Sequence, residues 1–153
     1  MVDFTGFNPS GGGFTWDYDA TVTAAHEVQT GDFFTIYDFG GFTGTTSEPA
    51  GWTFGSANSG VTPAFQTPAD DPGLPNLTWT YAGTTLFGFL GTFSAESLYS
   101  GIVFDNYSFQ DTQSSGGSTL TGTNSVEVAL VPEPSSLLLM GAGLVLLALR
   151  RRS

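Results

Sequence analysis

The 153-residue sequence contains no cysteine, and residues 1–149 contain neither lysine nor arginine. Without cysteine the chain has no disulfide, no thiolate metal site and no cysteine nucleophile. Nucleic-acid binding depends on cations that neutralise phosphates, and attraction to anionic lipid headgroups needs cations as well. We therefore expect no nucleic-acid partner, and no cofactor is indicated. The net charge of −11 is expected to keep the protein soluble and its copies apart.

Aromatic residues and glycine are abundant, and hydrophobic residues alternate with polar ones along several stretches. The pattern is strictest in FTWDYDATVT, which predicts an antiparallel strand over 14–23 with its aromatic side chains buried. GDFFTIYDFGGF has apolar residues on both faces, as in a central strand, and NLTWTYA places Leu77, Trp79 and Tyr81 on one face. Proline, glycine and acidic residues between them, over 57–75, predict a long surface loop.

These features predict about seven short strands separated by turns, with no helical periodicity before Ser135. The expected fold is all-β, a β-sandwich or jelly-roll-like domain followed by one C-terminal hydrophobic helix. We assign residues 1–131 to a β-rich domain and residues 132–153 to a separate C-terminal signal.

The C-terminal segment, VPEPSSLLLMGAGLVLLALRRRS, contains every basic residue of the chain. A helix from Ser135 to Leu149 would be about 22 Å long, against about 30 Å for the hydrocarbon core of a bilayer. Apolar side chains would cover its whole circumference, which argues against a buried helix of a soluble domain. The apolar residues are Leu137, Leu138, Leu139, Met140, Leu144, Val145, Leu146, Leu147 and Leu149. Arg150, Arg151 and Arg152 then place this end in the cytoplasm by the positive-inside rule.

The order of these features resembles the PEP-CTERM sorting signal of exported proteins in exopolysaccharide-producing Gram-negative bacteria. The sorting motif would be Val131, Pro132, Glu133 and Pro134. The resemblance implies exosortase, a membrane protease or transpeptidase, as the partner that cleaves near the tripeptide. The two prolines favour an extended peptide, which suits a protease substrate. A permanent anchor with an incidental Pro-Glu-Pro is the alternative.

Export requires a targeting signal, yet the first residues, MVDFTGFNP, contain neither a basic stretch nor an apolar stretch. We expect that Met1 is not the natural start and that a signal peptide precedes it. The expected route is an inner-membrane intermediate with the domain on the periplasmic side, followed by the cell surface or the extracellular space.

Few residues of the domain suggest chemistry. His26 is the single histidine, and no catalytic residue is assigned because nucleophile and base pairs are scarce. Asp17 and Asp19 are weak candidates for a metal site, with Asp70 or Asp71 as further Ca²⁺ ligands, or for a pair of glycosidase carboxylates. Trp52, beside a loop, is the tryptophan expected to be exposed to a sugar.

The sequence therefore predicts a non-enzymatic, exported surface or matrix protein with an acidic surface. The alternative is a carbohydrate- or Ca²⁺-binding β-sandwich module associated with exopolysaccharide, and a glycoside hydrolase is a third hypothesis.

Overall fold

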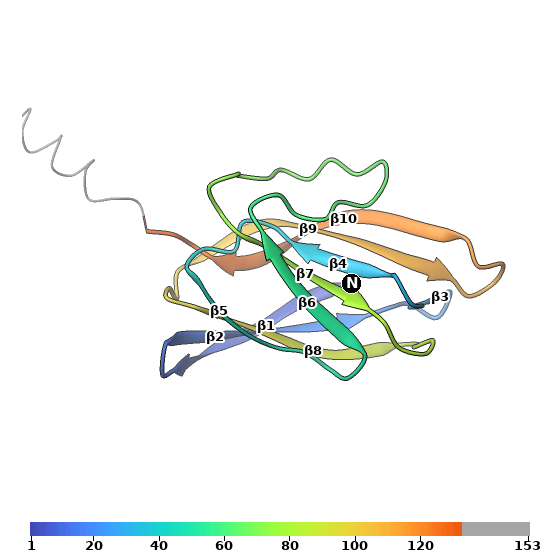
Figure 1. The fold of residues 1–153 in the computed structure, drawn as a ribbon, viewed down its shortest axis with the longest axis horizontal. Coiled ribbons are helices and arrows are strands. Elements are labelled where there is room, and N and C mark those ends of the chain that lie inside the picture. The colour runs from blue at the N-terminus through green and yellow to red at the C-terminus, as the bar shows by residue number, and fades with distance from the viewer. Residues whose placement is uncertain (133–153) are drawn as a thin grey trace, which may run out of the picture.

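The structure is a computed structural model that describes residues 1–132, in which all regular elements are β-strands (Figure 1). This confirms the predicted all-β class. The strands are β1 (Val2–Ser10), β2 (Gly13–Thr21), β3 (His26–Glu27), β4 (Phe33–Ile36), β5 (Phe42–Ser47), β6 (Trp52–Ala57), β7 (Asn76–Tyr81), β8 (Phe89–Ser97), β9 (Ile102–Gln113) and β10 (Thr119–Ala129).

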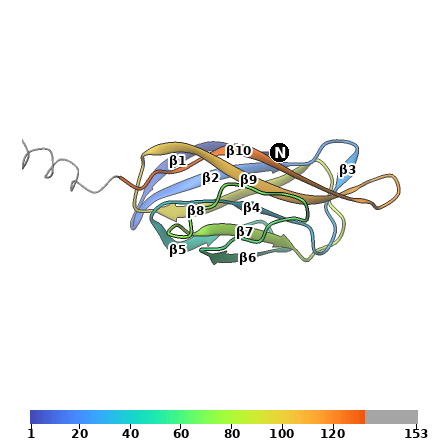
Figure 2. The same ribbon diagram turned by 90° about the horizontal axis from the view of Figure 1, so that it is seen from above.

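The strands form two antiparallel sheets that pack face to face, as Figures 1 and 2 show. The smaller sheet has the order β1-β2-β8-β5, and the larger has the order β10-β9-β4-β7-β6, with β3 paired to β9. β4 lies between β7 and β9, which confirms the central strand predicted from GDFFTIYDFGGF. The fold is therefore a β-sandwich.

Aromatic side chains fill the space between the sheets. Phe93 of β8 is fully buried, and its ring centroid lies 4.9 Å from that of Phe34 on β4 and 4.9 Å from that of Trp52 on β6. Trp16 and Trp79 are also fully buried, as their alternating patterns predicted. Such edge-to-face pairs stabilise the core beyond the effect of area burial alone.

The long loop predicted over 57–75 is present, and it covers the outer face of the larger sheet. Beneath it lies a layer of buried hydroxyl groups instead of apolar side chains. The Thr35 hydroxyl donates to the Val61 carbonyl at 2.7 Å and bonds to the Thr78 hydroxyl at 2.9 Å. The Tyr37 hydroxyl bonds to Ser108 at 2.7 Å. These bonds satisfy polar groups that would otherwise be costly to bury.

Three strands were not predicted from the sequence: β1, β5 and the two-residue β3. In β1 the register shifts between Phe4 and Gly6, so the pairing with β2 contains a bulge. Phe4 and Phe7 both lie against Trp16, at centroid distances of 4.9 and 5.1 Å, although their spacing of three breaks strand periodicity. β5 is a short edge strand whose middle residues, Thr43, Gly44 and Thr45, are exposed.

No helix within residues 1–132 is long and apolar enough to cross a membrane. The helix expected from Ser135 to Leu149 lies outside the described residues. The division into residues 1–131 and 132–153 remains a prediction.

Candidate functional site at the end of β10

The last described residues leave the sandwich at one end, where the β8–β9 connection and the residues after β4 also lie (Figures 1 and 2). The Gly40 amide donates to the Ala129 carbonyl at 2.9 Å, and the Leu130 amide donates to the Gly101 carbonyl at 2.8 Å. These two bonds hold Ala129 and Leu130 against the neighbouring connections of the domain.

Gly40 lies so close to this segment that no other residue fits without a shift. A Cβ atom at Gly40 would lie 2.4 Å from the Ala129 carbonyl oxygen and 2.7 Å from Cγ2 of Val131. The glycine therefore permits a close approach of two backbones, which is a position where glycine is required for steric reasons.

The sequence-predicted sorting motif begins at this point. Val131 is half-buried against Gly40, whereas Pro132 is exposed. Glu133 and Pro134 lie outside the described residues, as do the predicted membrane helix and Arg150–Arg152. The domain thus holds the chain up to Val131, and Pro132 is exposed.

A hollow beside the exit is lined by three carboxylates together with the end of β10. The lining residues are Asp38, Asp71, Gly73, Leu74, Val103, Asp105, Ala129, Leu130 and Val131. This group was not predicted, because its members come from four separate stretches of the chain. The only local signal is the acidic pair at 70–71.

Asp38 is the most buried carboxylate of this group, with 8% of its surface exposed. Its Oδ1 accepts a hydrogen bond from the Asp71 amide at 2.9 Å, and its own amide donates to Oδ1 of Asn76 at 2.8 Å. Burial raises the pKa of Asp38 from 3.8 to about 6, and the negative charges of Asp105, Asp70 and Asp71 act in the same direction. The bond from Asp71 opposes this rise.

Asp17 and Asp19 lie on the outer face of the smaller sheet, as the alternation of β2 predicted. Oδ1 of Asp17 accepts from the Ser94 hydroxyl at 2.6 Å, and Oδ1 of Asp19 accepts from the Thr92 hydroxyl at 2.6 Å. Each carboxylate is thus bonded to its own partner on β8. The suggested additional Ca²⁺ ligands bond elsewhere, with Asp70 accepting from Asn76 and Asp71 from the Gly73 amide.

Within residues 1–132 no group of three or more His, Cys, Asp or Glu side chains is placed to hold a metal ion. Asp17 and Asp19 therefore have no third carboxylate or imidazole ligand there.

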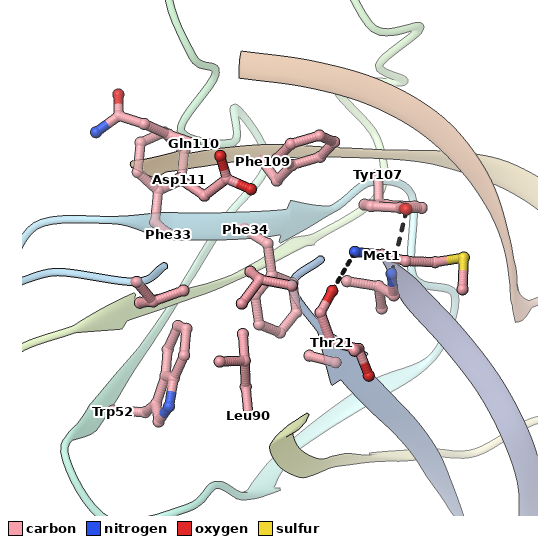
Figure 3. A pocket seen from close by; sticks show the side chains of 14 residues that line it. Met1, Thr21, Phe33, Phe34, Trp52, Leu90, Tyr107, Phe109, Gln110 and Asp111 are labelled. Carbon is pink, nitrogen blue, oxygen red and sulfur yellow. Dashed lines mark hydrogen bonds between the residues drawn. The ribbon is translucent and has the colours of Figure 1, made fainter. Parts of the chain in front are cut away.

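A small apolar pocket lies at the opposite end of the sandwich, between the two sheets (Figure 3). In this view Trp52 and Leu90 lie at the bottom, Phe34 lies at the centre, and Asp111 is the one carboxylate of the lining. Nδ1 of His26 lies 3.1 Å from Asp111, and burial raises the pKa of this carboxyl group. Within residues 1–132 no serine or threonine hydroxyl is hydrogen-bonded to the imidazole of His26, which is held by Asp111.

Trp52 was expected to be exposed, and this expectation is wrong. The side chain is 7% exposed and packs against Tyr81 and Phe93, with centroid distances of 5.0 and 4.9 Å. Trp52 is the first residue of β6, and β6 pairs with β7 so that its ring enters the core. It therefore offers no face on which a sugar ring could stack.

The segment that follows β10 is similar to a known sorting motif. Residues 130–152 match the model of the PEP-CTERM protein-sorting motif. The chain carries a PEP-CTERM sorting signal. The motif supports export across the membrane to the cell surface, and it implies processing by exosortase, a membrane-associated partner. No curated protein and no solved structure matches the chain.

Proposed function

We propose that this protein is an exported surface or extracellular-matrix protein with a structural or interaction role and no enzymatic activity. Its C-terminal PEP-CTERM signal spans the inner membrane through residues 135–149, and exosortase cleaves near Pro132–Pro134 after the domain has reached the periplasmic side. The observation that carries the proposal is the coincidence of the matched motif, residues 130–152, with the end of β10 at Ala129.

The way in which the domain presents the motif supports this proposal. Proteases bind substrates in an extended conformation, and a proline restricts both itself and the preceding residue to extended or turn conformations. Pro132 is exposed and follows directly on a segment held by backbone hydrogen bonds. A protease can therefore reach Pro132, the first residue of the tripeptide, without unfolding any strand.

The charge distribution agrees with the proposed orientation. All 14 acidic residues precede the three arginines, and no basic residue occurs before Arg150. Arginines beside an apolar segment favour retention on the cytoplasmic side, while long domains cross the membrane largely regardless of their charge.

A non-enzymatic role is proposed because the reactive groups of the domain are few and are used in structural bonds. The sequence contains no cysteine, and its single histidine pairs with Asp111. The carboxylates of Asp17 and Asp19 bond to strand hydroxyls. The exopolysaccharide-binding alternative has no aromatic platform at Trp52, the residue chosen for it, because that side chain is buried.

The proposal is tested by co-expressing the chain, behind an export signal, with and without an exosortase. We expect Glu133→Ala combined with Pro134→Ala to leave the protein uncleaved and in the membrane fraction. Pro72→Ala is the matched control, because Pro72 is exposed and its carbonyl, which accepts from Asn58, is retained. Cleavage that continues unchanged in the double variant would contradict the proposed role of the motif.

A further inference from the structure

Five large apolar side chains are exposed at the end of the sandwich where β10 leaves it. They are Leu98, Ile102, Val103, Phe104 and Leu130, with 58%, 49%, 37%, 68% and 42% of their surfaces exposed. We call this set the apolar rim.

Backbone pairing places the ends of β9 and β10 side by side, with Ile102 and Phe104 on one face of β9 and Val103 on the other. The register of β9 and β10 places Ile102 opposite Ala129, and the Leu130 amide bonds to the Gly101 carbonyl at 2.8 Å. Leu98 belongs to the short β8–β9 connection, and its amide donates to the Gly41 carbonyl at 2.9 Å. The rim therefore lies at the end of the sandwich where β10 and the described residues end.

The core does not account for the apolar rim. Exposed apolar residues are common singly, but a group of them with polar neighbours is typical of a surface that contacts another protein or a membrane. Phe104 is more than two-thirds exposed, and its partner across the ladder is Glu127. The exposure of Phe104 and Leu98, at 68% and 58%, shows that the core makes little use of these two side chains.

The length of the following segment limits the distance from the rim to a bilayer. From Pro132 to Leu137, where the uncharged apolar run begins, an extended chain spans at most about 17 Å. The polar interfacial layer of a leaflet is itself several ångströms thick. The tether is attached at the end of the domain that carries the apolar rim. Because the tether is short, the rim lies within reach of the lipid interface.

We propose that the apolar rim rests in the interfacial layer of a neutral lipid bilayer while the protein is still the uncleaved precursor. This inference depends on the proposed function, because it requires residues 135–149 to be in the membrane. Aromatic and aliphatic side chains partition into this layer by burying apolar area. Neutral lipid is the occupant because Asp105 and Glu127 adjoin the rim and residues 1–149 contain no lysine or arginine to attract anionic headgroups.

Docking of the rim gives the sorting motif a fixed position. Val131 is held against Gly40, so a domain seated on the bilayer keeps Pro132 at the membrane surface, where a membrane-embedded protease acts. The apolar rim is thus a positioning surface for the processing step, and it takes no part in the chemistry.

The absence of cysteine allows a direct test with single labels. Phe104→Cys places an environment-sensitive fluorophore on the rim, and Ile102→Cys provides a second position on it. Phe87→Cys is the matched control, because Phe87 is 61% exposed and lies in the β7–β8 connection at the opposite end. Each full-length variant is reconstituted into phosphatidylcholine vesicles that contain brominated phosphatidylcholine as a quencher.

We expect brominated lipid to quench most of the fluorescence at positions 104 and 102 and to leave position 87 unchanged. Equal quenching at 104 and 87, in protein that floats with the vesicles, would overturn the inference and leave the proposed function intact. Protein that does not float with the vesicles would overturn both. Energy transfer between labels on different molecules, without lipid quenching, would show that a second copy covers the rim and would also overturn the inference.

The lipid class is tested by replacing phosphatidylcholine with phosphatidylglycerol. We expect the quenching at position 104 to decrease, because the neighbouring carboxylates are repelled by anionic headgroups. Unchanged or stronger quenching would overturn the choice of a neutral surface.

Discussion

Replacement of Asp38 by asparagine is expected to stabilise the folded domain at neutral pH. Asp38 has a positive φ of 55°, a conformation that asparagine tolerates as well as aspartate does. An asparagine Oδ1 can still accept the hydrogen bond from the Asp71 amide. The substitution therefore removes a buried negative charge near Asp70, Asp71 and Asp105 and retains the local geometry.

The expected gain follows from the raised pKa. The pKa of Asp38 is about 6 in the folded protein against 3.8 without its surroundings. A difference of one pKa unit corresponds to about 1.4 kcal/mol, so the charged Asp38 side chain can destabilise the folded state by at most about 3 kcal/mol. The hollow beside Asp38 is open to solvent, which weakens the effect. We therefore expect Asp38→Asn to raise the free energy of unfolding by about 1 to 2 kcal/mol and the melting temperature by about 3 to 10 °C.

The sign of the pH dependence is fixed by the direction of the shift. Above pH 6 the folded protein contains ionised Asp38, and the full destabilisation is present. As the pH falls from about 6 to 3.8, the folded state binds a proton more readily than the unfolded state. The destabilisation by ionised Asp38 is therefore lost over this range. The advantage of Asp38→Asn should therefore be largest at pH 8 and should nearly vanish at pH 4.

Tryptophan fluorescence provides the assay, because all three tryptophans lie in the domain and are at most 7% exposed. Thermal unfolding of the full chain in a nonionic detergent would be compared for the wild type and the variant at pH 8 and pH 4. Equal stability at pH 8, or a difference that does not change with pH, would refute the assignment of a buried, repelled carboxylate at this position.

Two further substitutions test the packing. Gly40→Ala should destabilise the domain by about 1 to 3 kcal/mol, because its Cβ would overlap the Ala129 carbonyl, whereas Gly55→Ala has open space and should have a small effect. Phe93→Ala should cost about 3 to 5 kcal/mol in urea unfolding, because the side chain is fully buried between the sheets. Phe104→Ala, at an exposed position, should change the free energy of unfolding by less than about 0.5 kcal/mol.

Strict alternation explains which parts of the fold could be predicted. Trp16 and Tyr18 are fully buried as the pattern of β2 required, because side chains two apart share one face of a strand. β1 was missed because its bulge at Gly6 changes the spacing of Phe4 and Phe7 from two to three. A bulge is recognisable only from the pairing with the neighbouring strand.

The sorting motif was predicted because all its features are contiguous in the sequence. The residues that surround the motif in the structure were not predicted, because their positions depend on contacts between distant segments. Gly40 meets Val131 only after β10 has paired with β9, and Asp38 meets Asp71 only after the long loop has folded back. Trp52 was misplaced for a similar reason, since its burial depends on the position of β6 beside β7.

The intact mass of the protein recovered from cells that express exosortase tests the central claim most directly. The proposed function predicts that the mature protein ends near Pro132–Pro134 and lacks Arg150–Arg152, and that the full C-terminal segment remains when exosortase is absent. A surface-exposed protein that retains the complete segment, including RRRS, in the presence of an active exosortase would contradict the claim.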